Sequence, residues 1–597
     1  MGNGHYAWRI FAALPDAAVC LNVGAGSNSL VENLPATVHQ LYIVELLSDQ
    51  RGASAADSGS IRHPDNVIRL QGGDNCALPF PDNFFDFVSL SDVLAVIADD
   101  ASQGEVEARG PLRLRRLLLS PFGQYNPAAV QRKLLCEVRR VLKDDGELFI
   151  GADSRLSAAY LTGSKEQFTG LRFVSLLPRW IANIYSIVAR ARPYRTYTYT
   201  LAGYRAMLRQ AGFHTSRFLA LYSDFWNINE MVPIDDIGVP WTPAPAARWS
   251  DRLRRHPRCA AGFGIIATVS ASRTGTPLLR ALCDRISAAA GATGELDLEF
   301  ERILVTGKDK SILFGRTRVG ATAIVLRLPF SDAAAASERH NARVIAALPA
   351  ELAFATPASL ITGEYCGQAY FVETRCPGDT ISTQLDQPGN PQDAIALMRS
   401  AWLALAQASC HDEGSLVSRE YITSYLARLL LPFDDERCLS LLNGLHNDLL
   451  ENLADSAGTI GLQHGDFSVH NILVENGGLS GVVDWELTLT KGLPVLDAIN
   501  ACESLSRRLS QTGGVTDHVI ALTERRFVVP ELGPFLDEAF DYCSIPAQLR
   551  RSYLALYWLR HWSIQVAANP ELLPAAAPRA IERFTAWYGV RGGAAAP

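Results

Sequence analysis

The sequence has 597 residues, of which 48% are hydrophobic, and its formal net charge is −7. This length predicts several domains, and the apolar share is ample for buried cores. A negative charge without a basic block argues against a nucleic-acid partner. The 11 cysteines lie singly, without metal-binding spacing, as free thiols in a reducing compartment would. We expect a cytoplasmic protein, because the sequence shows neither a secretory signal nor a run of roughly 18 apolar residues.

The N-terminal elements predict a site for a nucleotide-containing ligand. Residues 17–23 form an apolar strand, and Gly24 and Gly26 follow it in a turn whose backbone amides can approach a ligand. The next predicted strand ends in Glu45, 21 residues after Gly24, where an acid can accept both ribose hydroxyls. Asp74 follows a third predicted strand. Taken alone, such a turn also suits a nicotinamide cofactor.

Two later segments narrow this interpretation. The runs LPFPDNFFDFV at 78–88 and EVRRVLKDDGEL at 137–148 follow in order. With the glycine turn, they resemble class I S-adenosylmethionine-dependent methyltransferases, whereas a nicotinamide site would give them no role. The resemblance implies an α/β, Rossmann-like domain with a doubly wound sheet. It also implies that Gly24 and Gly26 hold the methionine part of the cofactor, that Glu45 binds ribose and that Asp74 meets adenine.

Two residues depart from that family pattern. Asn22 stands where the family has an acid, and Asn28 stands where it has a third glycine. Both side chains can still form hydrogen bonds. The departures nevertheless leave open whether this domain is an active enzyme.

Two helical insertions are predicted within this domain, near 99–130 and 155–200. Residues 112–119 and 172–195 combine apolar and aromatic residues with arginines. Such segments either form a lid over the active site or lie in a membrane interface with arginines toward anionic headgroups. We favour the lid, because Pro178 interrupts the second segment. The alternative is a peripheral contact with the inner face of the membrane, and a lid that receives a lipid-linked substrate would combine the two.

The predicted domain boundary lies in the middle of the chain. The methyltransferase-like domain is expected over 1–272, and 273–294 is expected to be a linker containing a helix. A second domain is expected over 295–597. The shortness of the linker suggests that the two domains contact each other.

The second domain contains the most informative motif of the chain, His-Gly-Asp-Phe-Ser-Val-His-Asn at 464–471. Asp466 precedes Asn471 by five residues, and Asp484 ends the second strand of the hairpin that follows. This spacing is typical of phosphoryl transfer from ATP, in which the first acid orients and deprotonates a hydroxyl. The Asn and the second Asp then supply hard oxygen ligands for Mg²⁺.

These residues resemble the aminoglycoside phosphotransferase and choline kinase family over roughly 295–590. The resemblance implies an α+β, two-lobed, protein-kinase-like domain, with a small lobe at 295–372 and a large lobe at 373–597. It makes Asp466 the catalytic base and Asn471 and Asp484 the magnesium ligands. It also implies that Asp497 braces the catalytic loop, and that the strand containing Glu373 carries the adenine of ATP.

The small lobe departs from the family at one position. Arg327 replaces the lysine that contacts the nucleotide phosphates, and arginine keeps the charge without the compact ammonium group. The family's partner glutamate aligns with Asn341, and Glu338 lies one helical turn earlier. A domain that binds ATP without transferring phosphate therefore stays open.

The pairing of the two domains suggests a bifunctional transferase that uses S-adenosylmethionine, ATP and Mg²⁺. The domain order resembles bacterial kinase-methyltransferases that cap O-antigen polysaccharide, which implies a sugar or glycan acceptor, free or lipid-linked. The acceptor would be phosphorylated, and then it or its phosphate would be methylated. The alternatives are two independent modifications of a small natural product, or one domain that is degenerate and regulatory.

Overall fold

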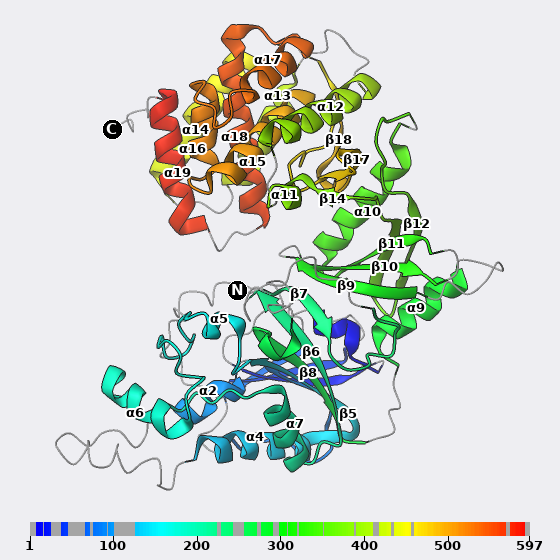
Figure 1. The fold of residues 1–597 in the computed structure, drawn as a ribbon, viewed down its shortest axis with the longest axis vertical. Helices are drawn as coiled ribbons and strands as arrows, with labels where there is room; N and C mark the ends of the chain where they lie inside the picture. The colour runs from blue at the N-terminus through cyan, green and yellow to red at the C-terminus, as the bar shows by residue number, and fades with distance from the viewer. Residues whose placement is uncertain are drawn as a thin grey trace. The chain divides into compact units, whose positions relative to one another are not determined.

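The structure is a computed structural model. It describes residues 7–15, 17–24, 38–45, 66–71, 76–91, 93–100, 126–223, 228–242, 256–270, 276–289, 298–306, 309–318, 321–349, 351–386, 390–409, 417–430, 435–454, 456, 459–568 and 573–590. The chain forms two compact units, Met1–Ala335 with Leu360–Glu373, and Ala336–Ser359 with Thr374–Pro597 (Figure 1). No helix of the described part is long and apolar enough to cross a membrane.

A 13-stranded sheet runs through the described part of the first unit, in the order β12-β13-β11-β10-β9-β7-β6-β8-β5-β4-β1-β2-β3. Its N-terminal strands are β1 Val19–Val23, β2 Gln40–Glu45, β3 Val67–Gln71, β4 Phe85–Ser91, β5 Leu142–Asp153, β6 Thr215–Ser223, β7 Ile228–Pro233 and β8 Gly262–Thr268. Strands β1 to β5 pair in parallel, and β8 is antiparallel to both β5 and β6. The strand order reverses between β1 and β4. Ligands of doubly wound sheets bind at the carboxyl ends of the strands that flank such a reversal.

Helices accompany these strands in the order expected for a doubly wound fold. They are η1 Ala7–Phe11, α2 Val93–Asp100, α4 Pro127–Val141, α5 Ala158–Leu161, α6 Arg179–Arg190, α7 Leu201–Gln210, η4 Pro257–Cys259 and α9 Leu278–Ala289. Helix α4 begins at an Asn126 cap, whose Oδ1 accepts from the Ala128 amide at 3.0 Å. The predicted insertion at 155–200 contains α5 and α6, whereas 101–125 of the other insertion lie outside the described residues.

The small-lobe strands continue the same sheet. They are β9 Leu298–Thr306, β10 Lys310–Thr317, β11 Ala323–Pro329, β12 Ser359–Tyr365 and β13 Gln368–Thr374. Strand β7 pairs antiparallel with β9, with Glu230 opposite Leu304 and Met231 opposite Ile303. One apolar cluster also contains residues of both parts, among them Phe11, Leu282 and Ile303. The compact units therefore divide the chain within the small lobe: its sheet strands β9, β10, β11 and β13 lie with the methyltransferase part, and residues 336–359 lie with the large lobe.

The second unit is mainly helical. It contains α11 Ile381–Gln384, α12 Pro391–Ser409, α13 Arg419–Leu430, α14 Glu436–Leu453, α15 Pro494–Ser510, α16 Val515–Thr523, α17 Leu532–Tyr542, η6 Ala547–Leu549, α18 Arg550–Ala568 and α19 Leu573–Tyr588. Its short strands and turn are β14 Asp379–Thr380, β15 Gly461–Gln463, β16 Ile472–Glu475, β17 Gly478–Val482, η5 Trp485–Leu487 and β18 Leu489–Gly492. The boundary between the two units falls inside helix α10, Asp332–Ala347, because the first unit ends at Ala335 and the second begins at Ala336.

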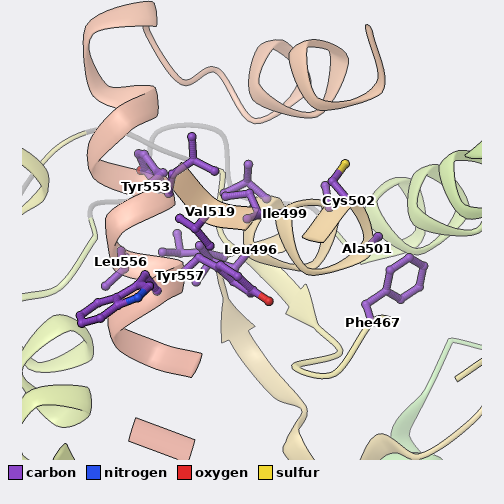
Figure 2. Close-up of a cluster of buried hydrophobic side chains, with 14 of the residues drawn as sticks. Phe467, Leu496, Ile499, Ala501, Cys502, Val519, Tyr553, Leu556 and Tyr557 are labelled. Carbon is purple, nitrogen blue, oxygen red and sulfur yellow. The ribbon is translucent and has the colours of Figure 1, made fainter. Parts of the chain in front are cut away.

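The core of this unit surrounds α15. Figure 2 shows Leu496 and Ile499 of this helix packed near Val519 of α16 and Tyr557 of α18. Residues 494–506 of α15 are all buried, including its polar side chains. A helix this thoroughly enclosed is a rigid support for the loop that contacts its N-terminal turn.

Candidate functional site

The loop between β15 and β16 carries the predicted catalytic residue of the second unit. The Asn471 amide nitrogen Nδ2 donates to the Asp466 carbonyl oxygen and to the Asp466 carboxylate Oδ2, both at 2.9 Å. These two bonds fix the orientation of the amide and leave its Oδ1 as the atom that can bind a metal. Asp466 itself is half-buried and accessible to a substrate.

The start of α15 fixes this loop in place. The Asp497 carboxylate accepts from the His464 amide at 2.6 Å and from the Gly465 amide at 2.9 Å, which agrees with the bracing role implied by the resemblance. The buried Arg560 guanidinium donates to the Gly465 carbonyl oxygen. Burial raises the pKa of Asp497 to about 7, although the two amide donors and the Arg560 charge oppose the rise.

Gly465 is the one position of the loop that demands glycine. Its φ is +87°, and a Cβ atom there would lie 2.2 Å from the Leu487 carbonyl oxygen. Both the left-handed backbone and the close approach exclude a side chain.

His464 links the catalytic loop to the following hairpin. Its Nδ1 accepts from the Asp466 amide at 3.2 Å, so the proton is on Nε2, which donates to the Val483 carbonyl oxygen at 3.1 Å. The ring centroid lies 4.5 Å from that of Trp485. Burial lowers the pKa of His464 to about 4, so the ring is neutral near pH 7 and serves as a positioning group.

The hairpin places Asp484 beside the catalytic loop. The Val483 amide donates to the Asn471 carbonyl oxygen at 3.0 Å, and Ile472 pairs with Val482 across β16 and β17. Asp484 follows with φ 69° and ψ 62°, a left-handed conformation that is rare for a residue with a side chain and is concentrated at functional sites. Asn471 and Asp484 thus lie at the same end of one hairpin, and their donor set of an amide oxygen and a carboxylate suits Mg²⁺.

Helix α10 contacts the segment that follows Asp484. The Asn341 Oδ1 accepts from the Trp485 amide at 3.1 Å, and His340 Nε2 lies 2.9 Å from the Thr488 carbonyl oxygen. Asn341, which replaces the family's glutamate, therefore binds the backbone next to the predicted metal ligand.

The structure gives Arg327 a partner that sequence analysis did not consider. Its Nε lies 2.8 Å from Oε1 of Glu373, on β13 beside β11, and both side chains are 7% exposed. The expected alternative, Glu338, is buried on α10. The two residues predicted to contact the phosphates and the adenine of ATP are thus joined in a buried ion pair. Their roles toward ATP stay predictions.

The methyltransferase-like site is only partly described. Gly24 follows β1, and its amide donates to the Val44 carbonyl oxygen at 3.2 Å, which ties the glycine turn to the end of β2. Glu45 is the last residue of β2. Both therefore lie at the carboxyl edge of the sheet, next to the reversal point, as a cofactor site requires. Gly26, Asn28 and Asp74 lie outside the described residues.

Asn22 and Asp153 complete the described carboxyl edge. Asn22 is fully buried within β1. Asp153 ends β5, its carboxylate accepts from the Tyr160 hydroxyl at 2.9 Å, and its carbonyl oxygen accepts from the Tyr204 hydroxyl at 2.9 Å. Sequence analysis did not single out Asp153. The signal that could have found it is its position, because an acid at the carboxyl end of a strand near the reversal of strand order is a candidate ligand-binding residue.

Comparison with known families decides the class of both parts. Residues 311–525 match the model of the phosphotransferase enzyme family (APH), and residues 21–109 match a methyltransferase domain model. The chain joins a methyltransferase domain to a phosphotransferase domain. The predicted recognition, fold class and enzyme type are confirmed at this level. These domains imply S-adenosylmethionine as methyl donor, and ATP with a divalent metal ion as phosphoryl donor.

Solved structures similar to this chain are aminoglycoside phosphotransferases. An apo thermostable mutant of APH(4)-Ia is 17% identical over 50% of this chain and 97% of its own, with a TM-score of 0.35. ADP-bound APH(2'')-Ib is 14% identical over 48% and 91%, with a TM-score of 0.32. The gentamicin complex of APH(2'')-IIa is 13% identical over 47% and 87%, with a TM-score of 0.33. No curated protein matches the chain.

Proposed function

We propose that the phosphotransferase domain phosphorylates a hydroxyl of a sugar or glycan, with Asp466 as the catalytic base. The observation that carries this proposal is that Asn471 donates to the Asp466 carboxylate while Asp484 follows at the same end of the adjoining hairpin. In the proposed reaction, the acceptor oxygen forms a bond to the γ-phosphorus of ATP, its proton passes to the Asp466 carboxylate, and ADP leaves. Mg²⁺ bound by Asn471 and Asp484 would neutralise charge on the phosphates.

The surrounding residues support this chemistry through position. Asp497 binds the amide of Gly465, and Arg560 binds its carbonyl oxygen. Both bonds hold the residue that immediately precedes the base. One Asn471 donor bond keeps the Asp466 carboxylate oriented, and the other, to the Asp466 carbonyl oxygen, holds the amide itself in place. Such preorganisation is the main contribution that a protein makes to phosphoryl transfer.

We further propose that the methyltransferase domain acts on the same acceptor, or on its new phosphate. Gly24, Gly26, Glu45 and Asp74 would bind S-adenosylmethionine, and methyl transfer needs mainly proximity and alignment. The continuity of the sheet from β3 to β12 supports joint action, because it ties the methyltransferase domain to the small lobe. We place this activity in the cytoplasm, where both cosubstrates are available. As with O-antigen capping, the acceptor would be a glycan that is free or lipid-linked.

One observation favours a second candidate. The buried pair of Arg327 and Glu373 engages two residues that were assigned to ATP. If this pair prevents both residues from contacting ATP, the phosphotransferase domain is degenerate and has a regulatory role.

The deciding experiment measures transfer of labelled methyl groups from S-adenosylmethionine into host glycan and lipid fractions, with and without ATP and Mg²⁺. Methylation that requires ATP supports a phosphorylated acceptor, whereas methylation indifferent to ATP refutes the shared pathway. The Asp466→Ala variant separates the two domains. We expect it to lose phosphoryl transfer while ATP binding, measured by calorimetry, changes little, because the base acts mainly in the transition state. Wild-type turnover by this variant would refute the assigned base.

A further inference from the structure

Helix α6 of the methyltransferase domain exposes a stripe of large apolar residues and buries two polar ones, unlike an ordinary surface helix. The residues it buries are Ala182, Asn183, Ser186 and Ile187. The large apolar residues it exposes are Trp180 at 60%, Ile184 at 45% and Val188 at 81%. These three are spaced four residues apart, so they form one stripe along the helix.

The inward face is fixed by specific hydrogen bonds. Asn183 Oδ1 accepts from the Tyr194 amide at 3.0 Å, and the Ser186 hydroxyl donates to the Arg192 carbonyl oxygen at 2.8 Å. The helix cannot turn its apolar stripe inward without breaking both bonds. The outward direction of Trp180, Ile184 and Val188 is therefore built into the fold.

Two further large apolar residues of the insertion are also exposed. Phe173 is 46% exposed with a left-handed φ of 61°, and Leu161 at the end of α5 is 51% exposed. Helix α6 projects from the side of the methyltransferase part of its unit (Figure 1). Large exposed apolar residues gathered on one element are typical of an interaction site.

The charge of the insertion indicates the partner. Between residues 155 and 200 the only acid is Glu166, which is 1% exposed, in a chain whose net charge is −7. The seven basic residues of this segment are Arg155, Lys165, Arg172, Arg179, Arg190, Arg192 and Arg195. Lys165, Arg172 and Arg192 are exposed. An apolar stripe flanked by exposed cations is complementary to a bilayer with anionic headgroups.

We propose that α6, with Phe173 and Leu161, docks this protein on an anionic membrane surface. Trp180, Ile184 and Val188 would enter the headgroup boundary, and the flanking cations would contact the lipid phosphates. This inference deepens the proposed function by bringing the domain to lipid-linked acceptors. Its test measures membrane binding and depends on neither phosphoryl transfer nor methyl transfer. The docking proposal and the proposed function can therefore fail separately.

The experiment is cosedimentation of the full chain with vesicles of phosphatidylcholine alone, or with one-third phosphatidylglycerol. Wild-type protein should bind the anionic vesicles and bind the neutral ones far more weakly. The triple variant Trp180→Ser, Ile184→Ser, Val188→Ser should bind at least about tenfold more weakly. Each glutamine substitution at Lys165, Arg172 or Arg192 should weaken binding by about fivefold at low salt. A matched control, Leu360→Ser with Val528→Ser, removes two side chains of 48% and 47% exposure elsewhere and should bind like wild type.

Three outcomes would overturn the proposal. Equal binding by the triple variant and wild type would show that α6 is not the contact. Absence of wild-type binding would indicate that another occupant, such as residues 101–125 of this chain, covers the stripe. A concentration-dependent dimer that the triple variant abolishes, without vesicle binding, would make the stripe an interface between copies. If the circular dichroism of the triple variant equals that of wild type, unfolding is excluded as the cause of its weaker vesicle binding.

Discussion

Acidification is expected to destabilise the phosphotransferase domain through His464. This imidazole is fully buried, and its pKa is lowered from 6.5 to about 4. Between these values the unfolded chain binds a proton that the folded chain excludes. The contribution of His464 to the free energy of unfolding is therefore fully present above pH 6.5, and it is lost as the pH falls toward 4. The loss is about 2 kcal/mol between pH 7 and pH 5, and about 3 kcal/mol in total.

The assay compares urea unfolding of the full chain at pH 7 and pH 5 with that of a His464→Asn variant. The asparagine oxygen can still accept from the Asp466 amide but does not titrate in this range. The unfolding transition that belongs to this domain is the one that ATP with Mg²⁺ shifts. Between pH 7 and pH 5, wild type should lose about 2 kcal/mol more than the variant.

A second buried group makes that comparison necessary. The raised pKa of Asp497 means that the folded chain binds a proton first as the pH falls, which stabilises it and masks part of the histidine effect. The variant retains Asp497, so the difference between the two proteins isolates His464. Equal pH dependence in wild type and variant would refute the reasoning.

Two further predictions concern packing and charge. Gly465→Ala should destabilise the domain by more than about 2 kcal/mol and abolish phosphoryl transfer, because the Cβ atom clashes with backbone. Gly477→Ala, at φ +78° with open space around it, should cost only about 1 kcal/mol in the same urea titration, and equal losses would contradict the clash. Glu373→Gln should cost about 3 kcal/mol, because it removes the negative charge from a buried ion pair with Arg327. Glu538→Gln, in an exposed pair with Arg399, should cost under about 1 kcal/mol, and a similar cost for both would show that burial is unimportant.

Local patterns made the phosphotransferase centre predictable. The residues from His464 to Asn471 form one short loop, and Asp484 follows after one hairpin. Their spacing therefore determines which side chains meet, and the hairpin lies where the alternation of apolar residues and turn residues placed it.

Contacts distant in sequence were not predictable in the same way. Arg327 pairs with Glu373, 46 residues later, because strand order in the sheet places β13 next to β11. Asp153 was not singled out because Gly151 and Ala152 before it carry little strand signal, although antiparallel pairing with β8 extends β5 to this residue. Tertiary pairing, rather than local propensity, determined both features.

The pairing of β7 with β9 also affects how the chain can be divided. An unpaired strand presents a row of amide and carbonyl groups that can recruit another chain. In this fold each of these two strands covers an edge of the other, and the Thr242 amide adds a bond to the Phe300 carbonyl oxygen at 2.9 Å. Cutting the chain at 273–294 would open both edges and expose shared core residues such as Leu282. The methyltransferase domain and the small lobe are therefore expected to fold, and to be inherited, as one piece.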